Sequence, residues 1–257
     1  MTSQAKILSI TILLSLVSFN PGAQESDVVM FDKLVPENVR ITNNDPVSQD
    51  YPDAEKIVNS FLHKWSVAGA SVAISKDGKL IFARGFGLTD TVDKIQTQPF
   101  NQFRIASISK LVTAIAVMKL HEEGKLSLQD KVFGHDGILN DPFFDEPKDK
   151  RVFDITVEQL LSHEAGWSQR YGDQMFMPIV VAEKLNVKPP VDTKMIIRFA
   201  LDKRLHYTPG MGRAYSNLGY SILGLVIEKI TGMPYEKYCK QAIMEPLGIY
   251  DMTIAGN

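Results

Sequence analysis

The stretch that decides the fold is residues 103–132, which read FRIASISKLVTAIAVMKLHEEGKLSLQDKV. Its centre, Leu111–Met118, is apolar on nearly every side, as in a helix that is surrounded by other elements. Gly124 is a suitable residue to follow a helix C-terminus. The pattern therefore predicts a central, buried helix over Ser107–Glu123.

Ser107 and Lys110 lie three residues apart at the start of this predicted helix. Side chains at i and i+3 are neighbours on a helix, so the lysine amine can reach the serine hydroxyl and act as its base. Backbone N–H groups at a helix N-terminus can also receive an oxyanion. The spacing alone is weak evidence, because Ser3-Gln4-Ala5-Lys6 has it too.

A second candidate is Tyr215-Ser216-Asn217, which follows the loop sequence Pro209–Gly212 and precedes an apolar helix. A tyrosine hydroxyl can relay a proton, and an asparagine amide can donate to and accept from a substrate amide. The alternative is structural: a loop tyrosine covers the core, and Asn or Ser caps the helix. Taken alone, this motif favours the structural alternative.

Considered together with their surroundings, the two motifs resemble the family of serine β-lactamases and penicillin-binding proteins, for which S-x-x-K with a partner box is a signature. The likeness is to its branch of class C β-lactamases, D-Ala-D-Ala carboxypeptidases and esterases. The similar stretches are residues 103–132, LLSHEAGW (160–167), PGMGRAYSNLGYSILGLVIEKITGMPY (209–235) and EPLGIYDM (245–252).

This resemblance implies roles for four residues. Ser107 is the expected nucleophile that forms an acyl-enzyme, and Lys110 accepts or relays its proton. Tyr215 is expected to take part in that transfer, and Asn217 to hold the substrate amide. The implied fold is α+β and β-lactamase/transpeptidase-like, with a helical region beside an antiparallel sheet.

One departure from the family concerns its third box, Lys/His-x-Gly on a sheet strand well after the tyrosine box, because no such triplet follows Asn217. We therefore expect the chain to be C-terminally incomplete, with later strands and a C-terminal helix missing and only the first hairpin of the sheet present. Lys76-Asp77-Gly78 and His135-Asp136-Gly137 match the box by letters, but we interpret them as a hairpin turn and a loop.

Other elements follow from local patterns. Asp53–Trp65 has apolar residues at helical spacing, and the runs Ala70–Ser75 and Lys79–Arg84 flank Asp77-Gly78, a dipeptide typical of a tight hairpin. Thr156 and Gln159 have capping-box spacing before another helix. Further helices are predicted over residues 192–201, 217–231 and 234–243.

The N-terminus indicates export. Residues 7–19 (ILSITILLSLVSF) are too short to span a bilayer as a helix, so residues 1–23 are predicted to be a signal peptide and the protein to be secreted or periplasmic, without a membrane anchor after cleavage. Residues 24–52 are interpreted as an extension or linker, and residues 53–257 as the hydrolase domain.

Composition excludes several classes of protein. A net charge of −2 without basic runs gives no nucleic-acid footprint. Cys239 is the sole cysteine and the five histidines lack ligand spacing, so we expect neither a disulfide nor a metal or other cofactor. The expected partner is a small-molecule or peptide substrate.

The prediction is therefore a serine hydrolase that acts through an acyl-enzyme on an amide, a β-lactam or an ester. Which of these is the substrate stays open, as does the oligomeric state. The alternative is a non-catalytic binding or regulatory module, or an inactive fragment of such an enzyme.

Overall fold

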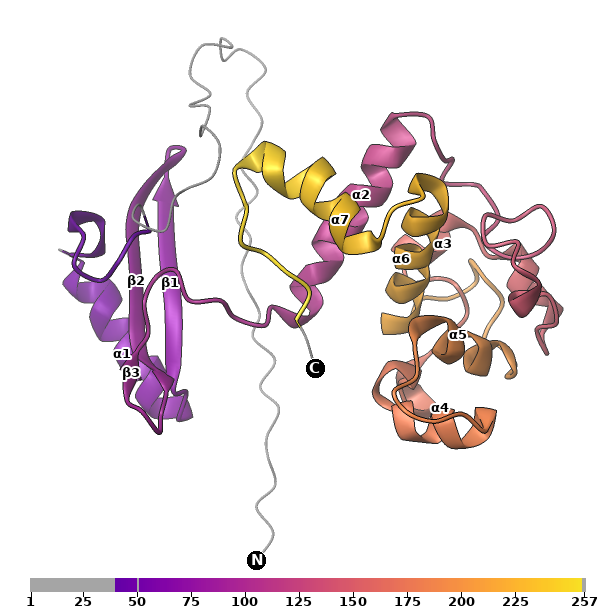
Figure 1. Cartoon of the computed structure of the whole chain (residues 1–257), viewed down its shortest axis with the longest axis horizontal. Helices are drawn as coiled ribbons and strands as arrows, with labels where there is room; N and C mark the ends of the chain where they lie inside the picture. Colours follow the sequence, from indigo (N-terminus) through magenta and orange to yellow (C-terminus); the bar gives the residue numbers. More distant parts are fainter. Residues whose placement is uncertain (1–39, 50, 256–257) are drawn as a thin grey trace, which may run out of the picture. The chain divides into compact units, whose positions relative to one another are not determined.

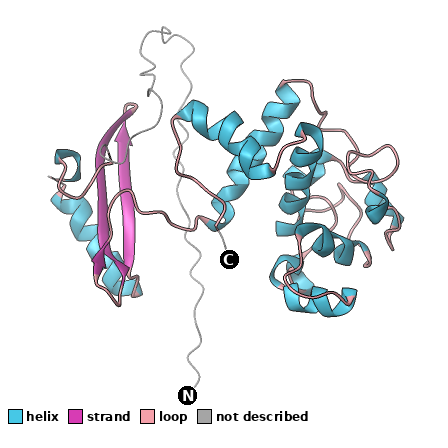
Figure 2. Ribbon diagram, in the orientation of Figure 1, coloured by secondary structure: helices cyan, strands magenta, loops and turns pink. Residues whose placement is uncertain are grey.

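The computed structural model describes residues 40–49 and 51–255. The predicted signal peptide and residues 24–39 of the predicted extension lie outside the described residues. The described chain is α+β, as predicted, and consists of a small antiparallel sheet with one helix and a larger set of helices (Figures 1 and 2). No helix in the described part of the chain is long and apolar enough to cross a membrane.

The predicted hairpin is confirmed and is longer than predicted. Strand β1 (Gly69–Lys76) pairs antiparallel with β2 (Lys79–Asp90), from Gly69 opposite Gly87 to Lys76 opposite Lys79. Asp77 and Gly78 have φ values of 52° and 72°, the left-handed pair that a two-residue hairpin turn requires. Lys76-Asp77-Gly78 therefore forms the predicted turn.

The expectation that only this hairpin of the sheet is present is wrong. A third strand, β3 (Ile95–Gln96), pairs antiparallel with β2. Two residues are too few to show an alternating pattern, which explains why the sequence does not predict this strand. Beside β3, the backbone of Gly85 comes so close to Thr97 that a Cβ at this position would clash with the Thr97 carbonyl.

Helix α1 (Pro52–Trp65) confirms the predicted helix. Its Leu62 and Val58 pack with Phe82 and Phe86 of β2 in a small apolar cluster. The other apolar residues of the predicted face, among them Ile57, which is 68% exposed, do not join this cluster. The buried stripe of α1 is therefore narrower than its apolar sequence pattern suggests.

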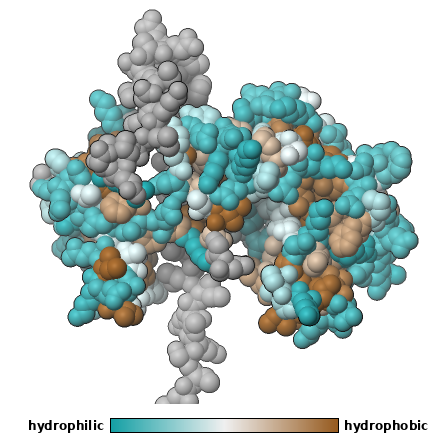
Figure 3. Space-filling model, in the orientation of Figure 1, coloured by the Kyte–Doolittle hydropathy of each residue, from teal (hydrophilic) through white to brown (hydrophobic). Residues whose placement is uncertain are grey.

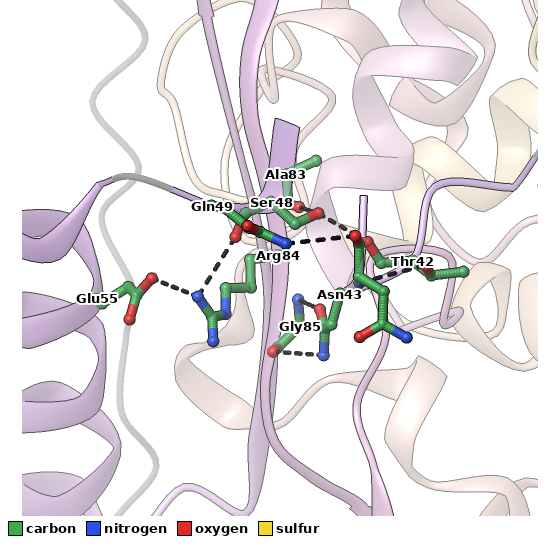
Figure 4. A network of polar contacts seen from close by, with 9 residues as sticks. Thr42, Asn43, Ser48, Gln49, Glu55, Ala83, Arg84 and Gly85 are labelled. Carbon is green, nitrogen blue, oxygen red and sulfur yellow. Dashed lines mark hydrogen bonds and ion pairs between the residues drawn. The ribbon is translucent and has the colours of Figure 1, made fainter. Parts of the chain in front are cut away.

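Residues 42–49 bind to β2 through polar contacts (Figure 4). The Asn43 side chain accepts from Gly85 N–H at 2.8 Å and donates to the carbonyls of Gly85 and Thr97 at 3.1 and 2.8 Å. Buried Ser48 donates to the Ala83 carbonyl at 2.5 Å. Asn43 thus bonds a strand backbone in both directions, much as another strand would.

The larger set of helices contains α2 (Ser109–Glu122), α3 (Val157–Leu161), α4 (Pro178–Leu185), α5 (Thr193–Leu201), α6 (Asn217–Thr231) and α7 (Tyr235–Cys239). A π-helical segment, Lys240–Met244, continues α7 and completes the predicted helix over 234–243. The capping box of Thr156 and Gln159 is present at the start of α3. Helix α4 was not predicted from the sequence.

Helix α6 contacts α2, α3, α5 and α7, so it lies at the centre of these helices (Figure 1). The prediction that the helix of Ser107 is buried all round is wrong for the described residues. Helix α2 buries Thr113, Ala116, Val117 and Leu120, but Leu111, Ile115 and Met118 are 55%, 41% and 43% exposed. An all-apolar sequence has no periodicity that tells the covered side from the open one. On the face shown in Figure 3, most of the coloured surface is hydrophilic, and apolar residues reach it in patches.

Replacing Asn43 with alanine should lower the free energy of unfolding by about 2 kcal/mol, because the Gly85 N–H and two carbonyls lose a partner. Urea denaturation followed by circular dichroism measures this. Asn44→Ala is the matched control, since Asn44 is exposed. Equal stability of the two variants would contradict the role given to Asn43.

Candidate active site

Ser107 lies in a 3-10 turn, Ala106–Ile108, that leads directly into α2. Ala106 has a φ of 46°, a left-handed conformation that costs a residue with a Cβ about 1–2 kcal/mol. The chain therefore bends sharply immediately before Ser107, and the serine side chain is exposed. The predicted helix start at Ser107 is in reality this turn, with the α-helix beginning at Ser109.

Tyr215-Ser216-Asn217 leads into the N-terminus of α6, and its three residues have different tasks. Ser216 is the N-cap, and its hydroxyl accepts from Gly219 N–H at 3.0 Å. The Tyr215 hydroxyl lies 2.5 Å from Ser107 Oγ. Tyr215 is 44% exposed, so it does not serve as a cover for the core. The structural alternative for this motif thus holds for Ser216 and not for Tyr215.

Lys110 connects the two segments. Its Nζ donates to Ser107 Oγ at 3.3 Å and to Asn217 Oδ1 at 2.6 Å, and it lies 4.8 Å from the centroid of the Tyr215 ring. The structure therefore brings all four predicted residues together. A neutral amine at this distance can take the proton of the serine hydroxyl, and a phenol bonded to the same oxygen can relay it.

Asp173 is a member of this site that the sequence did not point to. Its Oδ2 accepts from Asn217 Nδ2 at 2.6 Å and from Gln169 Nε2 at 2.6 Å. A carboxylate on one side and an amine on the other determine which way the Asn217 amide is turned, because the carboxylate can only accept and the Lys110 amine donates here. One N–H of Asn217 remains for a substrate. Asp173 stands in an irregular loop, where no spacing rule could identify it.

His163, from the quoted stretch LLSHEAGW, is also close. Its ring centroid lies 4.8 Å from that of Tyr215 and 5.1 Å from that of Tyr220. Burial lowers the pKa of His163 below its usual 6.5, and the nearby Lys110 and Arg213 lower it further. In the sequence, this histidine stood out only through its place in a stretch of family likeness, which assigns it no role.

A cavity of about 530 Å³ opens beside Lys110 and Asn217. Met175 and Phe176 contribute apolar surface to it, and Phe176 is 78% exposed. Tyr235 also lines the cavity, and burial raises its pKa to about 12, so this hydroxyl stays neutral. The cavity therefore offers apolar surface beside polar side chains such as Glu228 and Asn217.

Neither of the letter matches to a third box belongs to this arrangement. Lys76-Asp77-Gly78 is the turn between β1 and β2, as described above. His135 lies in a loop after α2, is almost fully exposed and pairs with Asp136 at 2.8 Å. Within residues 40–49 and 51–255, no group of three or more His, Cys, Asp or Glu side chains could hold a metal ion.

The loop that leads to Tyr215 is fixed by a buried carboxylate. Asp149 accepts from Leu205 N–H at 3.1 Å and from two side-chain nitrogens of Arg151 at 2.6 and 3.0 Å. Arg151 in turn donates to Thr208 Oγ1 and to the Leu205 carbonyl. These bonds hold the pKa of Asp149 at about 2, below its usual 3.8.

The comparisons with known proteins identify the family and the fold. The sequence model of the family described as Beta-lactamase matches residues 54–256. "Protein flp" of Staphylococcus aureus (strain N315) is 32% identical over 208 residues, which are 81% of this chain and 38% of that protein. The chain therefore spans well under half the length of this relative.

Two solved structures are similar in fold. One is the octameric penicillin-binding protein homologue from Pyrococcus abyssi, with a TM-score of 0.61 and 31% identity over 78% of this chain and 43% of that one. The other is EstCE1, described as a hydrolase with promiscuous acyltransferase activity, with a TM-score of 0.63 and 26% identity over 77% of this chain and 51% of that one.

Because the pKa of Asp149 is depressed, its contribution to stability is complete above about pH 4 and is lost as the pH falls through about 2. Asp149→Ala should lower the free energy of unfolding at pH 7 by about 2 kcal/mol and flatten its dependence on pH between 4 and 2. Urea denaturation at several pH values measures both. Asp154→Ala, which removes an exposed carboxylate, is the control; an Asp149 variant with the same acid profile as wild type would contradict the assignment.

Proposed function

Since the chain belongs to the β-lactamase family, we propose that the protein is a serine acyl hydrolase with Ser107 as nucleophile. The observation that carries this proposal is the position of Ser107 Oγ, 2.5 Å from the Tyr215 hydroxyl and 3.3 Å from Lys110 Nζ. A serine hydroxyl becomes a good nucleophile when a base within hydrogen-bond reach removes its proton. Two such groups are within reach here.

In the acylation step, Ser107 Oγ forms a bond to the substrate carbonyl carbon while its proton passes to Tyr215 or Lys110, whichever of the two is in its deprotonated form. The carbonyl oxygen becomes an oxyanion, which the Ser107 backbone N–H, in the turn that leads into α2, is placed to receive. The bond to the leaving group then breaks, and the leaving group takes up the proton. Water attacks the acyl-enzyme in the reverse manner and releases the acid.

The proposed substrate is an amide, a β-lactam or an ester. The free N–H of Asn217 can donate to a carbonyl oxygen near the acyl group, and the adjacent cavity with Met175 and Phe176 accepts an apolar substituent. The two similar structures, a penicillin-binding protein homologue and a hydrolase with promiscuous acyltransferase activity, are compatible with acyl chemistry. They support the class of reaction and leave the leaving group open.

We also propose that the protein acts outside the cytoplasm. Support comes from the sequence of residues 1–23, with a short apolar stretch of signal-peptide type after a cationic start. Cell fractionation followed by mass spectrometry of the protein's N-terminus would test this proposal. A protein that is found in the cytoplasm with Met1 still present would contradict it.

A fluorophosphonate or a fluorescent penicillin should label the protein covalently at Ser107. Peptide mapping by mass spectrometry locates the label. Ser107→Ala should abolish labelling, whereas Ser109→Ala, two residues further on, should keep it. Label on another residue, or labelling that survives Ser107→Ala, would contradict the proposal; no labelling of a folded wild-type protein would favour a non-catalytic binding module.

Lys110→Ala and Tyr215→Phe should each slow acylation of Ser107 by about 10²-fold, the usual effect of losing an acid–base group. The rate of acylation is measured by stopping the labelling reaction at several times and reading the fluorescence of the protein on a gel. Lys119→Ala is the control, because Lys119 is on the same helix but pairs with Glu123 away from Ser107. If both Lys110→Ala and Tyr215→Phe kept the wild-type rate, neither group would be the base.

A further inference from the structure

The two backbone amides that flank Tyr215 are both bound by a single residue, His163. Ala214 N–H donates to the His163 carbonyl at 3.0 Å, and Ser216 N–H donates to His163 Nδ1 at 3.2 Å. Tyr215 stands between these two bonds, with its hydroxyl 2.5 Å from Ser107 Oγ. We infer that His163 is a positioning residue that holds Tyr215 in reach of Ser107, with Nδ1 of a neutral imidazole as the acceptor. This inference rests on the proposed function.

His163 is itself held firmly enough to do this. It follows Ser162, the C-cap of α3, and has a φ of 64°, a left-handed conformation rare for a residue with a large side chain. Its carbonyl also accepts from the Tyr207 hydroxyl at 3.1 Å, and its N–H donates to the Leu160 carbonyl. Because α3 carries the capping box of Thr156 and Gln159, the acceptor is attached to a defined helix.

The chemistry of the Ser216 contact requires one tautomer. A backbone N–H can only donate, so Nδ1 must offer its lone pair and the ring proton must sit on Nε2. An imidazolium has no lone pair and would break this bond. Protonation of His163 would therefore release the Ser216 amide and leave Tyr215 attached on one side only.

The surroundings of His163 favour the neutral form. Burial is the largest cause that lowers the pKa of His163. Two cations, Lys110 of α2 and Arg213 of the loop before α6, lower it further. Three phenols also face it, those of Tyr207, Tyr215 and Tyr220. Burial raises the pKa of Tyr207 and of Tyr220, so these two add no charge near neutral pH. The Ser216 bond should thus be intact at neutral pH and weaken only below the usual histidine pKa of 6.5.

Two substitutions of His163 test separately the hydrogen-bond acceptor and the aromatic ring. His163→Asn keeps an acceptor oxygen near the place of Nδ1 and tolerates a positive φ. His163→Phe keeps a ring between Tyr215 and Tyr220 but has no acceptor. If His163 positions Tyr215 through Nδ1, acylation of Ser107 by a fluorophosphonate should stay within about 3-fold of wild type in the asparagine variant and fall about 10- to 100-fold in the phenylalanine variant, as for a displaced catalytic group.

The pH dependence gives a second readout of the same inference. Wild type should acylate more slowly at acidic than at neutral pH, and His163→Asn should show a smaller ratio of the two rates, because asparagine does not titrate. His135→Asn, in an exposed loop, is the control and should behave as wild type. A phenylalanine variant that acylates at the wild-type rate, or an asparagine variant as slow as the phenylalanine one, would overturn the inference.

A measurement without catalysis distinguishes failure of this inference from failure of the proposed function. Hydrogen exchange of the Ser216 amide, followed by NMR, should be slow in wild type and His163→Asn and fast in His163→Phe. The nitrogen chemical shifts of His163 should show a proton on Nε2 at neutral pH. Absence of label on wild-type Ser107 would refute the hydrolase proposal alone, whereas equal Ser216 exchange in all three proteins would refute the role of His163.

Discussion

The packing of α2 against α6 is the contact on which the candidate site depends. Ser107 and Tyr215 are 108 residues apart in the sequence, and each stands just before the N-terminus of one of these helices. The buried side chains of both helices, such as Val117 and Leu223, belong to one apolar cluster. Burying a side chain of this kind contributes about 1.5–3 kcal/mol. The apolar cluster thus fixes the separation of the two helix N-termini, and the side chains of Lys110 and Tyr215 are long enough to reach Ser107 across it.

This packing also brings polar groups together, and these groups need hydrogen-bond partners. Lys110 is half-buried as a residue, and an amine that is partly removed from water needs acceptors. Asn217 supplies one, and Asp173 holds the Asn217 amide in the orientation that makes this possible. Asp173 belongs to the loop before α4, so the position of this loop and the environment of Lys110 are linked through one amide group.

The sequence predicted the features that depend on neighbouring residues. The Asp77-Gly78 turn, the capping box of Thr156 and the ends of α6 at Asn217 and Thr231 are all local, and all are present. The four residues Ser107, Lys110, Tyr215 and Asn217 came from motifs and a family resemblance, and the structure places them together. Features that depend on tertiary contacts were missed. The two-residue strand β3 exists only because β2 offers an edge, and the open face of α2 cannot be read from a helix that is apolar all round.

Backbone strain marks the two segments that form the site. Six described residues other than glycine have a positive φ, and four of them lie in turns or at helix ends: Ser66, Asp77, Lys94 and Asn186. The remaining two are Ala106, directly before Ser107, and His163, which binds both amides around Tyr215. Alanine has no polar side chain to compensate a left-handed conformation, so the surrounding packing must impose it. Stability is therefore given up at the two places where the chain presents the serine and the tyrosine to each other.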